Sequence, residues 1–164
     1  MHYTGRECDV SPYDTNYSPA KNIPIVSAAT AWQSQNTGQV YILILNEALW
    51  MPNLPHSLID PNQLRHFGTT VQDNPVHMSP LHLRTEDARF SMELNMLGTI
   101  IYTETRTPTE VELNSCPHII MSLLHEWHPN KVLFTKYTRT LENGMSEISM
   151  KLVFRVYNGV KQNF

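Results

Sequence analysis

A nearly continuous apolar run, Gln39–Asn46, with the sequence QVYILILN, places the strongest restriction on how this chain folds. The run is rich in β-branched and leucine side chains and is short for a helix, so it predicts a strand covered on both faces. A turn signal, Asn36-Thr37-Gly38, precedes it, and Ala28–Trp32 is suited to be the partner strand of a hairpin. The expected core consists of Val40–Leu45 together with Leu49, Trp50, Leu58, Leu64 and Phe67.

Two short helices are expected, and each is marked by capping residues. Asp60 is suited to cap the first helix, with Pro61 at its first position and Gly68 at its end. Thr107-Pro-Thr-Glu110 has the pattern of a capping box, which opens a second helix that ends before Pro117. Both helices are too short to dominate the fold.

The remaining segments favour strands and loops. Met1–Pro24 is rich in Pro, Asn, Ser and Asp, which predicts loops with short extended pieces. Gly98–Thr103 predicts another buried strand. Asn143-Gly144 is a strong hairpin signal, and apolar residues alternate with mostly polar ones from Ile148 to Val156. The expected fold is therefore mainly β, with two short helices and a C-terminal β-hairpin.

The composition restricts the functions open to the chain. Only 16% of the 164 residues are charged, the net charge is −3 and basic residues form no run, so direct binding of nucleic acid is not expected. The two cysteines, Cys8 and Cys116, predict free thiols in an intracellular protein. We see no targeting signal, and the longest apolar run is far shorter than the ~20 residues of a membrane span, so a soluble, cytoplasmic chain without a membrane partner is expected.

Tyr41–Arg65 carries a resemblance to a known family. It is similar to the protease region of copia-type retrotransposon polyproteins, in which a strand ends in leucine, an aromatic residue, any residue and proline, as in Leu49–Pro52, and a short helix ends in Gln-Leu, as at Gln63-Leu64. Further stretches resemble the family in order and spacing between Thr4 and Phe134. They are Cys8–Tyr13, Pro24–Val26, Ala28–Ala31, Val71–Pro75, Gly98–Ile101, Thr105–Thr109, Cys116–His118 and His125–Trp127.

This resemblance implies a fold and an activity. It implies an incomplete retropepsin-like β-barrel over residues 1–134, followed by a C-terminal hairpin or linker of unknown role over residues 135–164. The family is an aspartic endopeptidase that works as a homodimer, in which each subunit supplies one Asp from an Asp-Ser/Thr-Gly triplet. The expected partners are thus a second copy or other segments of a polyprotein, and no cofactor is expected.

The catalytic triplet is missing from this sequence. An aspartic protease needs two carboxylates close enough to share one proton. The nearest imitation is Asp14-Thr15-Asn16, which makes Asp14 the catalytic candidate, with an Asx-turn residue as the alternative. None of the aspartates is followed by Ser/Thr-Gly; they are Asp9, Asp14, Asp60, Asp73 and Asp87.

Three functions follow from the missing triplet. The chain is expected to begin downstream of the triplet and to be a catalytically inactive, protease-like domain. The first alternative is a β-rich protein-binding or assembly module that uses the former dimer surface. The second alternative is a protease whose triplet comes from another chain.

Histidine and cysteine residues suggest a possible metal site. Cys116, His118, His125 and His128 are the right kinds of ligand for zinc, but the HExxH spacing is absent, because His125-Glu-Trp-His128 is one residue short. The alternative is a set of surface histidines around a packed Trp127. Cys116 is also a candidate nucleophile, although it lies at the end of a helix and not at its N-terminus. The sequence therefore predicts no bound metal.

Overall fold

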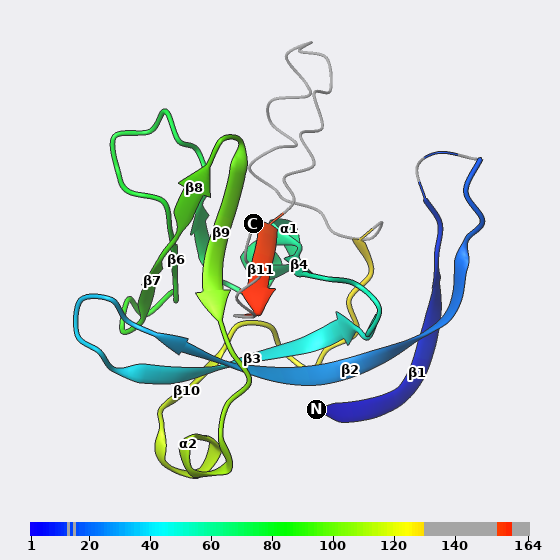
Figure 1. Ribbon diagram of the computed structural model, residues 1–164, viewed down its shortest axis with the longest axis horizontal. Helices are drawn as coiled ribbons and strands as arrows, with labels where there is room; N and C mark the ends of the chain where they lie inside the picture. The colour runs from blue at the N-terminus through cyan, green and yellow to red at the C-terminus, as the bar shows by residue number, and fades with distance from the viewer. Residues whose placement is uncertain (13, 15, 130–153, 159–164) are drawn as a thin grey trace. The chain divides into compact units, whose positions relative to one another are not determined.

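The computed structural model describes residues 1–12, 14, 16–129 and 154–158 (Figure 1). Within them the chain is mainly β, as predicted, with eleven strands and two short helices. The described elements form two compact units. Among the described residues, unit 1 contains 1–57, 104–125 and 156–158, and unit 2 contains 58–103, 126–129 and 154–155. The C-terminal hairpin expected at Asn143-Gly144 lies outside the described residues, apart from strand β11 (Phe154–Asn158).

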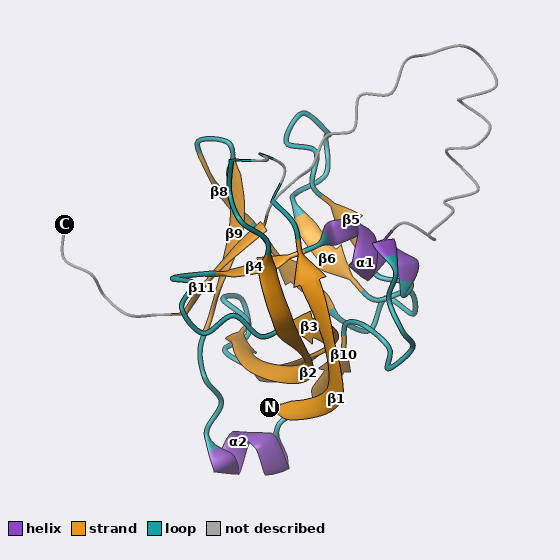
Figure 2. Cartoon of the chain, turned by 90° about the vertical axis from the view of Figure 1, so that its right-hand side faces the viewer, coloured by secondary structure: helices purple, strands orange, loops and turns teal. Residues whose placement is uncertain are grey.

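Unit 1 is built on one four-stranded sheet, drawn among the orange strands of Figure 2. Its order is β1-β2-β3-β10, where β1 is His2–Val10, β2 is Ala20–Gln33, β3 is Val40–Leu49 and β10 is His118–Ile120. The first three strands are antiparallel, and β10 runs parallel to β3. The pairing of β2 with β3 confirms the predicted hairpin, whose turn contains Gly38 at a positive φ of 70°.

The N-terminal segment was predicted as loops with short extended pieces, but it contains the nine-residue strand β1. Residues of β1 and the first part of β2 pair over Met1–Pro24, including Pro24 itself opposite Glu7. Proline, which has no N–H to donate, is tolerated here because the pairing shifts register between Tyr3 and Glu7. Its carbonyl still accepts a hydrogen bond from the backbone N–H of Trp50 at 2.9 Å. Long-range pairing thus overrides a composition that is typical of loops.

Helix α1 (Pro61–His66) confirms its predicted start. The side chain of Asp60 accepts a hydrogen bond from the backbone N–H of Asn62 at 2.8 Å, and Pro61 lies at the start of the helix. Leu64 is buried, with 1% of its surface exposed. Gly68 follows the helix with a φ of 88°, as expected of a residue that ends it.

Helix α2 (Glu110–Ser115) begins two residues later than the predicted capping box. Its N-cap is Thr109, whose hydroxyl accepts from the backbone N–H of Glu112 at 3.2 Å while the Glu112 carboxylate accepts from the backbone N–H of Thr109 at 2.9 Å. Thr107 and Glu110 have the same spacing. The later box is formed because Arg106 also binds the Glu112 carboxylate, with Nη1 2.7 Å from Oε2.

Unit 2 contains short strands. Strands β5 (Thr70–Gln72), β6 (His82–Arg84) and β7 (Ser91–Glu93) form an antiparallel sheet in the order β5-β6-β7. Strands β8 (Asn95–Leu97) and β9 (Ile100–Thr105) form an antiparallel hairpin, and β4 is Ser57–Ile59.

Strand β9 confirms the strand predicted at Gly98–Thr103, with a later start. Gly98 has a φ of 61° and lies in the turn between β8 and β9, so the strand begins at Ile100. All three sheets of the described residues have open strand orders and none is closed into a barrel.

The expected core is partly wrong. Ile42, Leu43 and Leu64 are buried, but 44% of Leu49, 38% of Trp50 and 56% of Leu58 are exposed. Strand β10 pairs with β3 only as far as Ile44, so it leaves the end of β3 without this neighbour. The apolar composition of β3 alone did not show where its pairing with β10 ends.

Candidate functional site

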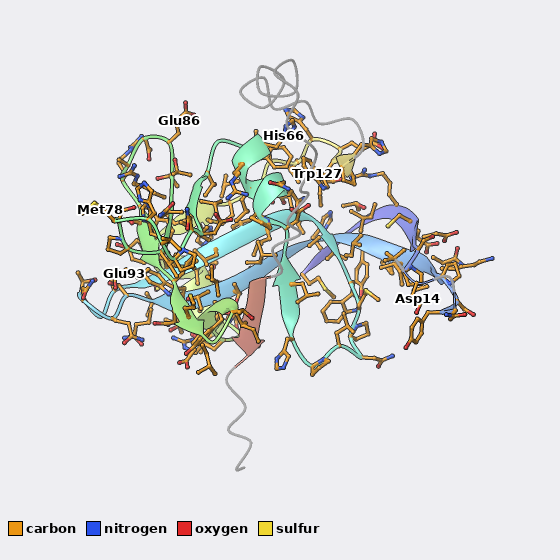
Figure 3. All side chains as sticks on the ribbon, turned by 90° about the horizontal axis from the view of Figure 1, so that it is seen from above. Asp14, His66, Met78, Glu86, Glu93 and Trp127 are labelled. Atoms are coloured by element: carbon orange, nitrogen blue, oxygen red, sulfur yellow. The ribbon has the colours of Figure 1, made fainter. Side chains whose placement is uncertain are left out.

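Asp14, the sequence candidate for catalysis, lies in an exposed turn between β1 and β2 (Figure 3). Its carboxylate accepts a hydrogen bond from the backbone N–H of Asn16 at 2.9 Å, and its carbonyl accepts one from the backbone N–H of Tyr17 at 3.2 Å. These are the bonds of an Asx turn. The carboxylate here orders a loop and is open to water.

Three of the four candidate zinc ligands have other contacts. Cys116 is the C-cap of α2, and its backbone N–H donates to the carbonyl of Glu112 at 2.9 Å. Nε2 of His118 donates to the carbonyl of Leu113 at 2.9 Å, and Nε2 of His128 lies 2.5 Å from the carboxylate of Glu126. His125 is exposed. The described residues contain no group of three or more His, Cys, Asp or Glu side chains that could hold a metal ion.

Trp127 packs on the end of helix α1. Its ring centroid lies 5.2 Å from that of His66 and 6.1 Å from that of Phe67 (Figure 3). The aromatic rings therefore attach the segment at Trp127 to unit 2. This contact explains one of the histidines around Trp127 as a packing partner.

Both cysteines are free thiols and are partly buried. Burial raises the pKa of the Cys8 thiol, and the nearby charge of Asp9 raises it further. A raised pKa reduces the fraction of thiolate, which is the nucleophilic form. Cys8 is therefore a poor nucleophile.

The unit 1 sheet also carries a polar cluster that was not predicted from the sequence. We call it the bulge cluster, and it consists of Arg6, Ser27, Asn46, Glu47 and Ser122. Val26 pairs with Ala48 and Ala28 with Leu45, so Asn46 and Glu47 together face Ser27 alone. This is a β-bulge, and Glu47 has a φ of 56°.

Hydrogen bonds in the bulge cluster join β3 to the chain after β10. The hydroxyl of Ser122 accepts from the backbone N–H of Asn46 at 2.8 Å and donates to its carbonyl at 2.9 Å. The side-chain amide of Asn46 donates to the carbonyl of Ser122 at 2.5 Å. All of these groups are buried. They fix the end of β10 beside the bulge.

An ion pair in the bulge cluster joins β1 to β3 across β2. The guanidinium of Arg6 donates to the carboxylate of Glu47, whose side chain is only 3% exposed, while that of Arg6 is 39% exposed. The hydroxyl of Ser27, on the strand between them, is buried and has no hydrogen-bond partner among the described residues. The one carboxylate of the cluster is buried and already paired with Arg6, so it is not free to share a proton with a second carboxylate. Its interactions hold three strands together.

The sequence contains one signal for this bulge, which is a pair of polar residues directly after an apolar run. Asn46 and Glu47 follow QVYILIL directly, and the apolar pattern then resumes at Ala48 and Leu49. Polar side chains inside such a run indicate an irregularity in the strand. Their partners, Arg6 and Ser122, are too far along the chain to be assigned from the sequence.

Unit 2 contains an open, mainly apolar groove. It has a volume of about 490 Å³ and is lined mainly by proline, methionine and leucine. Met78 is fully exposed, and 46% of Met96 is exposed. Figure 3 labels Met78. The lining residues are Pro75, His77, Met78, Ser79, Pro80, Leu81 and Met96.

Comparison with known proteins gave no match: no protein-family model, curated protein or solved structure matches this chain significantly. The described helices include none with the length and hydropathy needed to cross a membrane. The function must therefore be argued from the residues and their geometry.

The carboxylate of Glu112 should stay ionised to unusually low pH. The hydrogen bond from Arg106, followed by that from the backbone of Thr109, lowers its pKa from 4.5 to about 2. Because the folded pKa is depressed, Glu112 contributes its stabilisation above pH 4.5 and loses it as the pH falls through about 2. We expect NMR titration of its side chain to show this pKa.

Arg106→Gln provides the test of that cause, because it removes the charge that donates to Glu112. The pKa of Glu112 should then rise towards its ordinary value. Arg84→Gln, on β6 in unit 2, is the control and should leave the titration unchanged. An unchanged Glu112 pKa in Arg106→Gln would contradict this account.

Proposed function

We propose that this chain is a retrotransposon-derived, aspartic-protease-like domain that does not cleave peptides as a chain of these 164 residues. The resemblance of Tyr41–Arg65 to copia-type proteases supports the origin, and the absence of Asp-Ser/Thr-Gly supports the loss of activity. The observation that carries the proposal is the exposed Asx turn at Asp14. An intracellular, cytoplasmic location and a retropepsin-like ancestry of the β-fold belong to the same proposal.

The purified chain should show no peptide cleavage that pepstatin inhibits, at any pH from acidic to neutral. The reason is that Asp14 lies in an exposed turn without the glycine that lets two such carboxylates approach each other and share one proton. Release of fragments from a denatured protein substrate, followed by mass spectrometry, is the measurement. Acid-optimum cleavage that Asp14→Asn abolishes would contradict the proposal and give Asp14 a catalytic role. The same cleavage in Asp14→Asn would indicate a contaminating protease.

A second candidate function is a β-rich protein-binding or assembly module that uses the former dimer surface. Strand β10 is the last strand of the unit 1 sheet among the described residues, and 60% of its Ile120 is exposed. Leu123 and Leu124 follow with 46% and 72% exposed. Strand edges with exposed apolar side chains are sites where other chains add. A second copy or another polyprotein segment is the partner we infer.

The chain should therefore self-associate, and Ile120→Lys should weaken that association. A lysine on an edge strand disfavours pairing, and we expect the dissociation constant to rise by about tenfold or more, because burial of one large apolar side chain has that order of effect. Sedimentation velocity over a range of concentrations measures it.

Tyr17→Lys is the matched control for this experiment. Tyr17 is also strongly exposed, at 68%, but lies in the turn before β2. It should leave the association unchanged. Equal behaviour of Ile120→Lys and Tyr17→Lys would show that β10 is not the surface used.

A further inference from the structure

The two chain segments that line the groove of unit 2 contain no formally charged residue. Residues 74–83 and 94–103 contain no Asp, Glu, Lys or Arg. The polar side chains in its wall bind each other, because Nδ1 of His77 accepts from the backbone N–H of Ser79 at 3.2 Å and lies 2.9 Å from the Ser79 hydroxyl. These two segments therefore offer no opposite charge to a charged ligand.

The backbone edge of strand β8 borders the same groove. Met96 lines the groove from β8, which is the end strand of its sheet and pairs only with β9 among the described residues. All three β8 residues are exposed. The backbone N–H of Leu94 donates to the carbonyl of Leu81 at 3.0 Å, which ties the loop that forms the groove to the chain just before β8. The groove and this strand edge therefore form one surface.

These features define the chemistry of an occupant. The volume of about 490 Å³ is within the usual range of binding clefts, about 300–1,000 Å³. The two polar side chains of the lining, His77 and Ser79, bind each other, so they offer few of the directed polar contacts that orient a small molecule. An end strand gives main-chain hydrogen bonds to an added strand, and pockets beside it take alternate side chains. Methionine side chains adapt to varied apolar shapes.

We propose that this groove binds an uncharged, extended peptide segment of a partner protein, which adds as a strand beside β8 and places alternate apolar side chains against Met78 and Met96. This inference rests on the second candidate function and deepens it. The groove in unit 2 is a second binding surface, separate from the β10 edge in unit 1. Because the main chain provides the hydrogen bonds, recognition would depend on the backbone conformation and on the lack of charge more than on one particular sequence.

The test is titration calorimetry of the full chain with a short, blocked peptide that alternates valine and threonine. Two further peptides are compared: one with glutamate in place of threonine, and one N-methylated along the edge that would face β8. We expect saturable binding of the first peptide only. Loss through N-methylation would show that main-chain hydrogen bonds are used.

Met78→Glu and Met96→Glu locate the binding. Each should weaken it by about tenfold or more, since each replaces a buried apolar contact by a charge in an uncharged groove. Met78 is fully exposed in the free chain, so its substitution does not depend on refolding the core. Val111→Glu, at an exposed apolar position in unit 1, is the control and should leave the affinity unchanged.

Three results would overturn the inference, and they differ from one another. Binding that survives both methionine substitutions would place the peptide elsewhere and leave the binding function intact. Dimerisation that Met78→Glu abolishes, without peptide binding, would make a second copy the occupant. If the chain neither binds the peptide nor self-associates through Ile120, the binding function itself fails together with the groove.

Discussion

Ser122→Ala should lower the free energy of unfolding by about 2–3 kcal/mol, which is large for the loss of one hydroxyl group. The substitution removes two hydrogen bonds to the backbone of Asn46, at 2.8 and 2.9 Å, in a place where Ser122 is only 1% exposed. The side chain is otherwise nearly the same size, so the cost comes from buried polar groups that lose a partner. Urea denaturation followed by circular dichroism measures it.

Ser91→Ala is the control for that experiment. Ser91 lies exposed on β7, and its substitution should change stability by no more than about 0.5 kcal/mol. If the two alanine variants unfold at the same urea concentration, the bonds between Ser122 and Asn46 do not hold β10 on the sheet. If only Ser122→Ala loses stability, we also expect faster hydrogen exchange at the backbone N–H of Met121, which donates to the carbonyl of Ile44 at 2.9 Å.

Arg6→Ala should also lower the free energy of unfolding by about 2–3 kcal/mol. It deprives the Glu47 carboxylate, which is only 3% exposed, of its guanidinium partner. Breaking a fully buried ion pair costs about 3–5 kcal/mol, and the lower figure here reflects the 39% exposure of the Arg6 side chain. The same urea denaturation measures the change.

A second substitution separates the charge effect from lost packing. Glu47→Gln in the Arg6→Ala background should restore part of the stability, because a neutral amide is cheaper to bury than an unpaired carboxylate. Arg84→Ala, at an exposed position on β6, should have little effect. No recovery in the double variant would mean that Arg6 acts through its alkyl contacts and not through its charge.

The two substitutions address one question, which is how a bulged sheet stays in register. At the bulge, Asn46 and Glu47 face Ser27 alone, and Glu47 takes a φ of 56°, which is uncommon for a residue with a side chain. Ser122 follows β10 and binds the bulge from that side of β3. Arg6 lies on β1 and binds the bulge from the opposite side, across β2. The side chains of Arg6 and Ser122 thus stabilise a local backbone conformation that would otherwise be unfavourable.

Local signals in the sequence determined several elements of this protein. The apolar run of Val40–Leu45 produced a strand, the turn at Asn36-Thr37-Gly38 paired it with β2, and Asp60 with Pro61 began α1. Each depends on residues within a few positions of one another, so composition and spacing are sufficient. The absence of an Asp-Ser/Thr-Gly triplet is likewise a property of the sequence alone.

Only the tertiary structure decided the rest. Strand β1 forms in a loop-like sequence because β2 is available to pair with it, and β10 lies parallel to β3 although the two are far apart in the chain. The bulge cluster brings Arg6, Glu47 and Ser122 together, and the unit 2 groove joins residues 75–81 to Met96. These arrangements depend on long-range pairing, which fixes the neighbours of each side chain and is not written in local sequence patterns.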